Sequence, residues 1–272
     1  MKDVKALIIT GFGLNCDNET AHAFELAGAQ PHRVHINELI SGEVSLADFH
    51  ILAFGGGFSW GDDHGAGVIL ALKLKKHIGK DLLQFIEDGK LIIGICNGFQ
   101  ALANLGLLPG LNGSYTDRSV SITYNDTGFR DHWVKLAANE NSPCVFTKEL
   151  GVVDYPIRHG EGKVIADADV IKGLVENNQV VFQYAKEDGS IARGEFPANP
   201  NGSLEDIAGI CDATGRIFGL MPHPEAFNHV TNHPDWTRMR EQARREGRPL
   251  DTGETVGIKL FRNGVEYIRD HF

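Results

Sequence analysis

Apolar positions in the first hundred residues alternate between two spacings. Short runs rich in β-branched or aromatic residues predict strands, and longer stretches with apolar residues three or four positions apart predict helices. The predicted strands are Lys5–Thr10, Arg33–Ile36, His50–Phe54 and Lys90–Ile95. The predicted helices between them are Asn18–Ala27 and Val68–Asp88. This alternation predicts βαβ units on a mostly parallel central sheet flanked by helices, and hence the α/β class.

The apolar pattern changes in the middle of the chain. Between Gly113 and about Leu220 it consists of short β-like pieces separated by turns: Val120–Tyr124, Trp133–Leu136, Gln179–Tyr184, Asp206–Cys211 and Ile217–Met221. Short strands joined by turns favour antiparallel pairing. Since the sequence contains no internal repeat, we predict a small antiparallel β extension of the same domain, so that residues 1–272 form one domain.

The end of the chain divides into a polar segment and a helix. Val256–Arg269 has apolar residues at helical spacing and predicts a closing helix. Residues 235–252 before it are polar and rich in arginine, and stand out as a candidate insertion. Their arginines indicate either a solvated helix face, which is the more common case, or a docking site for an acidic partner. Our hypothesis is that this segment shapes a partner interface.

Charge and cysteine spacing argue against several classes of protein. The formal net charge of −10 over 272 residues is unsuited to a protein that binds nucleic acid through its phosphates. No apolar run reaches the length of a membrane span, and Met1–Asp3 leads directly into a predicted strand rather than into a signal sequence. The four cysteines form no C-x-x-C pair, which speaks against a zinc site and a disulfide framework. We therefore expect a soluble, cytoplasmic protein without membrane association and without a bound metal.

One cysteine occupies an unusual setting. The apolar strand ending at Ile95 runs directly into Gly94-x-Cys96-x-Gly98, the thiol form of a nucleophile elbow, a turn so tight that only small residues fit beside the nucleophile. A helix predicted from Asn97 to Leu105 would point its free N–H groups and positive dipole end at the sulfur and favour the thiolate. The spacing therefore predicts that Cys96 is a nucleophile.

The alternative role for such a cysteine is structural. A cysteine that follows an apolar strand is more often a small core residue than a reactive one. The second glycine of the elbow, together with a candidate base far downstream, favours the reactive role for Cys96. The other three cysteines lack such a setting, and we interpret them as core or surface residues: Cys16, Cys144 and Cys211.

The candidate base lies in Met221–Glu225. A thiol nucleophile needs a group that takes its proton and later returns one to the leaving amine, and the pKa of histidine suits both tasks. Prolines on both sides of His223 fix the local backbone, so that His223 and Glu225 should project from one side and the carboxylate can orient the imidazole. An H-x-E pair alone is a weak signal, but with the elbow upstream it indicates a Cys-His-Glu triad.

Two further stretches indicate a ligand site. The glycines of Gly55–Gly57 form either a tight turn or a loop whose N–H groups face an oxyanion beside the thiol. No Gly-Lys-Ser/Thr follows them, so the loop does not indicate ATP binding, and no ligand cluster supports a metal at Asp62 and Asp63. In His159–Gly162, the glycines suggest close approach of the backbone to a ligand, which favours a substrate pocket over a second base.

Together these stretches resemble the class I glutamine amidotransferases, and among them the glutaminase subunits of phosphoribosylformylglycinamidine synthase. The resemblance spans over four fifths of the chain. Its matching stretches are Gly13–Asp17, Glu19–Thr20, Ala23–Ala29, Gly56–Asp63, Gly94–Gln100, His159–Gly162, Asn199–Ser203, Ile207–Ile210 and Met221–Glu225. The chain departs from the common form at Trp60, where tyrosine is usual, and at His132, where arginine is usual.

The resemblance implies a function and a role for each matching residue. Cys96 would attack the side-chain carboxamide of L-glutamine, giving a thioester and ammonia, with His223 and Glu225 as its base pair. The implied oxyanion hole is formed by Gly57 and Asn97. The implied glutamine-binding residues are Gly56, Gln100, His159 and Glu161.

The resemblance also implies partners. A separate synthetase subunit would bind ATP and magnesium, receive the ammonia and convert formylglycinamide ribonucleotide to formylglycinamidine ribonucleotide in purine biosynthesis, and a small accessory subunit often joins such complexes. No cofactor is expected in this chain itself. The alternatives are a sibling class I amidotransferase of another biosynthetic pathway, a free-standing cysteine hydrolase of related fold, and an inactive regulatory module of the same fold.

Overall fold

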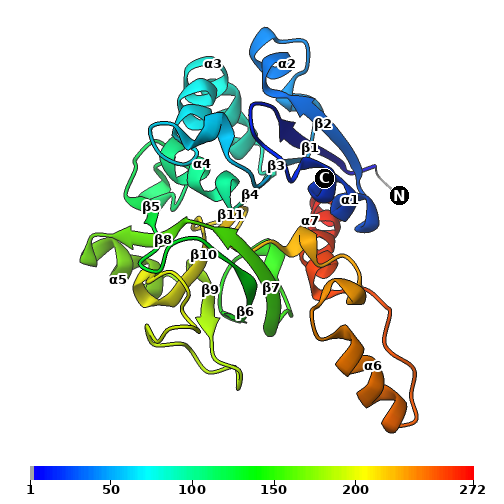
Figure 1. Ribbon diagram of the computed structural model, residues 1–272. Coiled ribbons are helices and arrows are strands. Elements are labelled where there is room, and N and C mark those ends of the chain that lie inside the picture. The colour runs from blue at the N-terminus through cyan, green and yellow to red at the C-terminus, as the bar shows by residue number, and fades with distance from the viewer. Residues whose placement is uncertain (1–2) are drawn as a thin grey trace.

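The computed structural model describes residues 3–272. Met1 and Lys2, which were part of the argument against a signal sequence, lie outside the described residues. Its main feature is a nine-stranded sheet of order β2-β1-β3-β4-β11-β10-β9-β6-β7 (Figure 1). The strands are β1 (Lys5–Thr10), β2 (Gln30–His35), β3 (Ile51–Phe54), β4 (Leu91–Ile95), β6 (Arg130–Ala138), β7 (Val152–His159), β9 (Val180–Ala185), β10 (Ile207–Cys211) and β11 (Ile217–Leu220). From β2 to β11 the neighbours are parallel, and from β11 to β7 they are antiparallel. The predicted α/β class, with an antiparallel extension, is confirmed.

The parallel strands lie where the apolar pattern placed them, with one correction. The strand predicted at Arg33–Ile36 begins earlier, at Gln30, and ends at His35, because Ile36 starts the helix α2 (Ile36–Ser41). His35 caps this helix by accepting from the N–H of Asn37, while Glu38 accepts from the N–H of His35 at 2.7 Å. A histidine is an unusual cap, which is why the sequence pattern did not reveal the helix.

The middle of the chain contains more regular structure than the sequence predicted. The strand β7 and the helix α5 (Ala168–Glu176) were not anticipated, and β8 (Glu161–Ala166) pairs with β5 (Val120–Tyr124) as a separate antiparallel sheet. β7 is buried on most of its length and β8 alternates, and both carry glycine or proline near their ends. Such short segments give weak periodic signals.

Helices cover both faces of the parallel half. α1 (Asp17–Leu26) packs with α7 (Val256–His271), and α3 (Val68–Glu87) packs with α4 (Asn97–Leu105) on the other side (Figure 1). α6 (Trp236–Arg245) lies in the predicted polar segment 235–252 and extends away from the rest of the molecule. Among residues 3–272 no helix has both the length and the apolar character that crossing a membrane requires.

The parallel strands bring the chemistry-bearing loops together. Phe54 pairs with Gly94 and Ile95 pairs with Leu220, so β3, β4 and β11 end at the same edge of the sheet. The loops that follow them contain the three-glycine turn, the elbow cysteine and the Met221–Glu225 segment. Ligand sites in open α/β sheets form at this edge.

Candidate active site

Cys96 sits on a strained turn between β4 and α4. Its backbone has φ 53° and ψ −108°, a conformation that is rare for a residue with a side chain. A Cβ added at Gly98 would lie 2.0 Å from the carbonyl oxygen of Phe54, and one at Gly94 would lie 2.6 Å from Leu102. Only glycine fits at these two positions, so the structure confirms the tight elbow that the spacing predicted.

His223 and Glu225 form a buried pair immediately after β11. The imidazole Nδ1 lies 2.6 Å from Oε1 of Glu225, and the two residues are 2% and 1% exposed. Burial alone would lower the pKa of His223, but the Glu225 carboxylate and the thiols of Cys96 and Cys16 together hold that pKa well above its ordinary value. Pro224 opens a 3₁₀ turn that includes Glu225, which places both side chains on one side, as expected from the flanking prolines.

Cys16 also contacts this pair, which the sequence did not predict. Its Sγ, an oxygen of Glu225 and a nitrogen of His223 all lie within 4.8 Å of one another. Burial raises the pKa of the Cys16 thiol, which donates to Oδ1 of Asn15 at 3.3 Å. The one sequence signal was its place in the Gly13–Asp17 stretch. Nδ1 of His223 and Oε1 of Glu225, 2.6 Å apart, share a hydrogen bond.

The three-glycine loop lies against the imidazole. A Cβ at Gly56 would be 2.7 Å from Cε1 of His223, so a larger residue would displace the ring. Gly57 has φ 147° and forms an isolated β-bridge with Leu14. In this bridge the N–H of Asn15 donates to the carbonyl of Gly56. This pairing leaves the N–H of Gly57 without an acceptor among residues 3–272. An oxyanion hole at Gly57 and Asn97 stays a prediction, with a geometry that suits it.

A cavity of about 200 Å³ opens beside Cys96. It is smaller than the roughly 300–1,000 Å³ of pockets for drug-sized ligands, and suits a molecule the size of an amino acid. Its lining residues are Gly57, Phe58, Asp62, Cys96, Gln100, Tyr124, Phe129, Arg158, His159, Gly160 and Glu161. A larger hollow of about 420 Å³ between Ala138 and Gly151 contains none of the predicted site residues.

Three of the residues predicted to bind glutamine line this cavity and are held there by polar contacts. Gln100 donates through Nε2 to the carbonyl of Glu161, and its Oε1 accepts from Nδ2 of Asn97 at 3.0 Å. Nδ2 of Asn97 also donates to Asp62. The side chain of Asn97 therefore braces the cavity wall, and its backbone N–H belongs to the first turn of α4.

His159 is a neutral residue in this structure. Burial, together with His223 and His132, lowers its pKa to about 3. Asn125 fixes it by donating to its carbonyl oxygen at 2.9 Å and contacting its Nδ1 at 3.2 Å. A histidine that stays neutral does not serve as a second base near pH 7, which supports the interpretation as a pocket residue.

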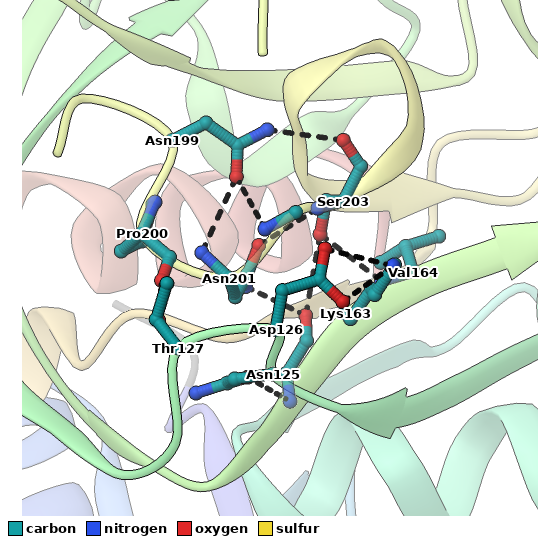
Figure 2. A network of polar contacts seen from close by, with 11 residues as sticks. Asn125, Asp126, Thr127, Lys163, Val164, Asn199, Pro200, Asn201 and Ser203 are labelled. Carbon is teal, nitrogen blue, oxygen red and sulfur yellow. Dashed lines mark hydrogen bonds and ion pairs between the residues drawn. The ribbon is translucent and has the colours of Figure 1, made fainter. Parts of the chain in front are cut away.

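The Asn199–Ser203 loop braces the strand that follows His159 (Figure 2). Asn201 donates through Nδ2 to the carbonyl of Gly162 at 2.8 Å, and the hydroxyl of Ser203 accepts from the N–H of Val164 at 3.0 Å. Asn199, Asn201 and Ser203 are all buried. The sequence marked the Asn199–Ser203 stretch only by its resemblance to a family. In the structure it supports β8, which begins at the cavity residue Glu161.

Comparison with known proteins identifies the family of the chain. The family model of the CobB/CobQ-like glutamine amidotransferase domain matches residues 3–268. The chain is 46% identical to phosphoribosylformylglycinamidine synthase subunit PurQ of Methanococcus maripaludis strain S2, over 97% of each chain, and 46% identical to the subunit of the same name from Dehalococcoides mccartyi, over 99% of each.

The chain is also similar to solved structures. A chain in the structure of PurLQS from Thermotoga maritima is 29% identical, with a TM-score of 0.68 over 98% of this chain and 99% of that one. A glutamine amidotransferase from the same organism, 15% identical with a TM-score of 0.54 over 98% and 99%, shares the fold. The chain therefore belongs to the CobB/CobQ-like glutamine amidotransferase domain family and, within it, to the class I glutamine amidotransferases of the PurQ type.

Proposed function

We propose that this chain hydrolyses L-glutamine to glutamate and ammonia, with Cys96 as nucleophile and His223 and Glu225 as its acid–base pair. The observation that carries the proposal is the geometry around Cys96. A cysteine on a strained elbow lines a cavity of amino-acid size. It interacts with a buried histidine, which is hydrogen-bonded to a carboxylate at 2.6 Å.

The reaction follows from these groups. The Cys96 thiolate attacks the carboxamide carbon, and a C–S bond forms as the carbonyl oxygen becomes an oxyanion. The raised pKa of His223 keeps its imidazolium available, so that it donates a proton to the leaving nitrogen and ammonia departs. The neutral imidazole then takes a proton from water, which attacks the thioester and releases glutamate.

The oxyanion would be bound by backbone N–H groups. Gly57 lines the cavity, and its backbone N–H, which has no acceptor among the described residues, is free to donate. The N–H of Asn97 belongs to the first turn of α4, where N–H groups have no acceptor within the helix. Glu225 holds the imidazole in the orientation that the two proton transfers need. No cofactor or metal takes part in the proposed mechanism.

The ammonia would be used on another chain. Relatives 46% identical over nearly the whole length are named as subunits of phosphoribosylformylglycinamidine synthase, and a related chain was solved in PurLQS. We infer that a synthetase subunit, which binds ATP and magnesium, takes up the ammonia to convert formylglycinamide ribonucleotide to formylglycinamidine ribonucleotide. A small accessory subunit would complete the complex.

Substitution of the nucleophile tests this proposal. In the complex of this chain with its synthetase partner, Cys96→Ala should abolish glutamine-dependent synthesis and leave ammonia-dependent synthesis near the wild-type rate, because only the nitrogen source is lost. Both rates are measured from product formation with glutamine or an ammonium salt. Cys144→Ala, in the core and away from the cavity, is the control. Equal loss of both activities in Cys96→Ala would contradict the proposal.

A further inference from the structure

Cys16 belongs to the cluster around His223, but the proposed mechanism gives it no part. Its Sγ, a ring nitrogen of His223 and a carboxylate oxygen of Glu225 all lie within 4.8 Å of one another. Among residues 3–272 no other three cysteine, histidine or acidic side chains bring their ligand atoms so close together. All three residues are buried, at 7%, 2% and 1% exposure. Thiolate, imidazole and carboxylate are the groups by which proteins bind zinc.

The backbone holds Cys16 beside the imidazole. Its N–H donates to the carbonyl of Gly56 at 3.2 Å, and its own carbonyl accepts from the N–H and the hydroxyl of Thr20 at 3.0 and 2.7 Å. A Cβ at Gly56 would lie 3.1 Å from Sγ of Cys16, and 2.7 and 3.4 Å from Cε1 and Nδ1 of His223. The thiol and the Nδ1 side of the ring therefore lie against the same glycine, and both are fixed by the local backbone.

One carboxylate oxygen of this cluster is left over. Oε1 of Glu225 shares the 2.6 Å hydrogen bond with Nδ1 of His223, whereas its Oε2 is buried and has no hydrogen-bond partner among residues 3–272. The thiol of Cys16 donates to Oδ1 of Asn15 at 3.3 Å and not to this oxygen. A buried polar atom without a partner marks a position that a ligand can satisfy. The cluster thus offers a thiol and a carboxylate oxygen that the proposed chemistry does not use.

We propose that Cys16, His223 and Glu225 form a binding site for Zn²⁺ or a similar thiophilic divalent cation, and that the bound ion inhibits glutamine hydrolysis. The ion replaces the proton that Nδ1 and Oε1 share, and these two atoms separate by roughly half an ångström, because zinc binds nitrogen and oxygen at about 2.0–2.2 Å. Cys16 supplies the third ligand, and its thiol proton passes to solvent as the bond between sulfur and metal forms. The two negative charges of thiolate and carboxylate then balance the ion, as a buried charge requires.

Inhibition follows from the state of the imidazole. A neutral ring that binds an ion through Nδ1 carries its own proton on Nε2, so Nε2 cannot take a proton from Cys96 or from water. Glu225 also no longer orients the ring through its hydrogen bond. This consequence rests on the proposed function and adds reversible regulation by a metal ion to it.

Cobalt binding tests the site without reference to activity, because Co²⁺ takes the same ligands as Zn²⁺ and a cobalt–thiolate bond gives an absorption band. The complex with the synthetase partner should show this band in Cys96→Ala, which lacks the thiol of the nucleophile. Adding Cys16→Ala should lower the affinity for Co²⁺ at least about tenfold, since even the loss of a group that only supports a metal ligand costs about 10–100-fold. Adding Cys144→Ala instead removes a buried cysteine outside the cluster and is the matched control.

Zinc inhibition tests the consequence. Zn²⁺ should inhibit glutamine-dependent synthesis by the wild-type complex and spare ammonia-dependent synthesis, and a zinc-selective chelator should restore the rate. Cys16→Ala should need at least about tenfold more Zn²⁺ for the same inhibition. The magnesium of the assay should not compete, because Mg²⁺ prefers oxygen ligands in octahedral geometry.

Two results would overturn the inference. One is a cobalt band of equal strength with and without Cys16, which would place the ion elsewhere. The other is equal zinc inhibition of synthesis from glutamine and from ammonia, which would place its action on the partner. Absence of glutamine-dependent synthesis before zinc is added would contradict the proposed function instead, and the cobalt titration would still decide whether the site exists.

Discussion

Cys96 adopts a backbone conformation that costs about 1–3 kcal/mol for a residue with a side chain. The surrounding packing maintains it, because Gly98 touches the carbonyl of Phe54 and Gly94 touches the start of α4. The thiol is thereby presented at the cavity instead of being buried in the sheet. At the scale of single residues, the proposed nucleophile therefore depends on the glycines beside it as much as on its own thiol.

In the proposed mechanism Glu225 acts through His223, and the removal of its charge tests this. In Glu225→Gln the imidazolium loses its charged partner, so kcat for glutamine hydrolysis should fall about 10²–10⁴-fold with KM little changed. The pKa assigned to His223 in the pH profile of kcat/KM should move down, because Glu225 is the charge that raises it. Glu187→Gln, at an exposed position, is the control. A normal pH profile in Glu225→Gln would count against the role of the pair.

Asp62 also makes stability depend on pH. Its pKa is raised from 3.8 to about 6 in the folded chain, so the fold favours the protonated form. The resulting stabilisation is present below about pH 4 and is lost as pH rises through about 6. Asp62→Asn should therefore be more stable than wild type at pH 8, by of order 1 kcal/mol, since solvent screens this half-exposed group, and equally stable at pH 4. Thermal unfolding at the two pH values measures this, and a gain of the same size at both would refute the explanation.

At the scale of elements, α7 holds the turn that carries Glu225. Thr255 caps α7 and its hydroxyl donates to the carbonyl of Phe227, while Tyr155 in β7 donates to the carbonyl of Val256 at 2.9 Å. A Cβ at Gly257 would lie 2.4 Å from the carbonyl oxygens of both Pro224 and Phe227. The position of the Glu225 carboxylate thus depends on α7, the last helix of the chain. α7 also packs against α1, near the start of the sequence.

Gly257→Ala should disturb this contact. The added methyl group has to displace the turn or the helix, so the free energy of unfolding should fall by about 1–3 kcal/mol and kcat should fall with it. Gly173→Ala is the matched control, because Gly173 also lies in a helix but has open space around it, and alanine there should be neutral or stabilising by up to about 1 kcal/mol. Denaturant unfolding and glutaminase assays measure both variants. Unchanged stability in Gly257→Ala would show that the contact relaxes freely.

At the scale of the whole molecule, residues 235–248, which include α6 and are called the α6 arm below, extend away from the rest of the chain (Figure 1). The ion pairs of its side chains stay within the arm, such as Arg238 with Asp235 and Arg244 with Glu241. Arg240 lies over the ring of Trp236 at 4.9 Å. The arm therefore contributes little to the core, which suits a segment that contacts a partner.

Replacing Asp235–Arg248 by a short glycine-serine linker tests that hypothesis. We expect the melting temperature to change by less than about 2 °C, because the hydrophobic core of the described residues includes none of the replaced residues. We expect the complex with the synthetase subunit to weaken or disappear in gel filtration. Cys96→Ala, which leaves the arm intact, is the control for assembly. Unchanged complex formation after this replacement would contradict the hypothesis that the segment contacts the partner.

The sequence by itself determined the α/β alternation, the limits of β1 and α4, the elbow at Cys96 and the His223–Glu225 pair. These features depend on side-chain periodicity, glycine spacing and prolines, which act between residues close together in the chain. Trp60 and His132, where the chain departs from its family, were equally visible. Their surroundings were not: Trp60 stacks on Phe12 at 4.7 Å, and His132 acts on the pKa of His159.

Only the tertiary structure decided which distant residues share the site. It brought Cys16 to His223 and placed Asp62, which the sequence left without a role, beside Glu161 in the cavity of Cys96. It also assigned the Asn199–Ser203 loop to bracing the cavity wall. Each of these contacts joins segments far apart in the sequence. A periodic pattern carries no information on the charge, burial or unpaired atoms that result from such contacts.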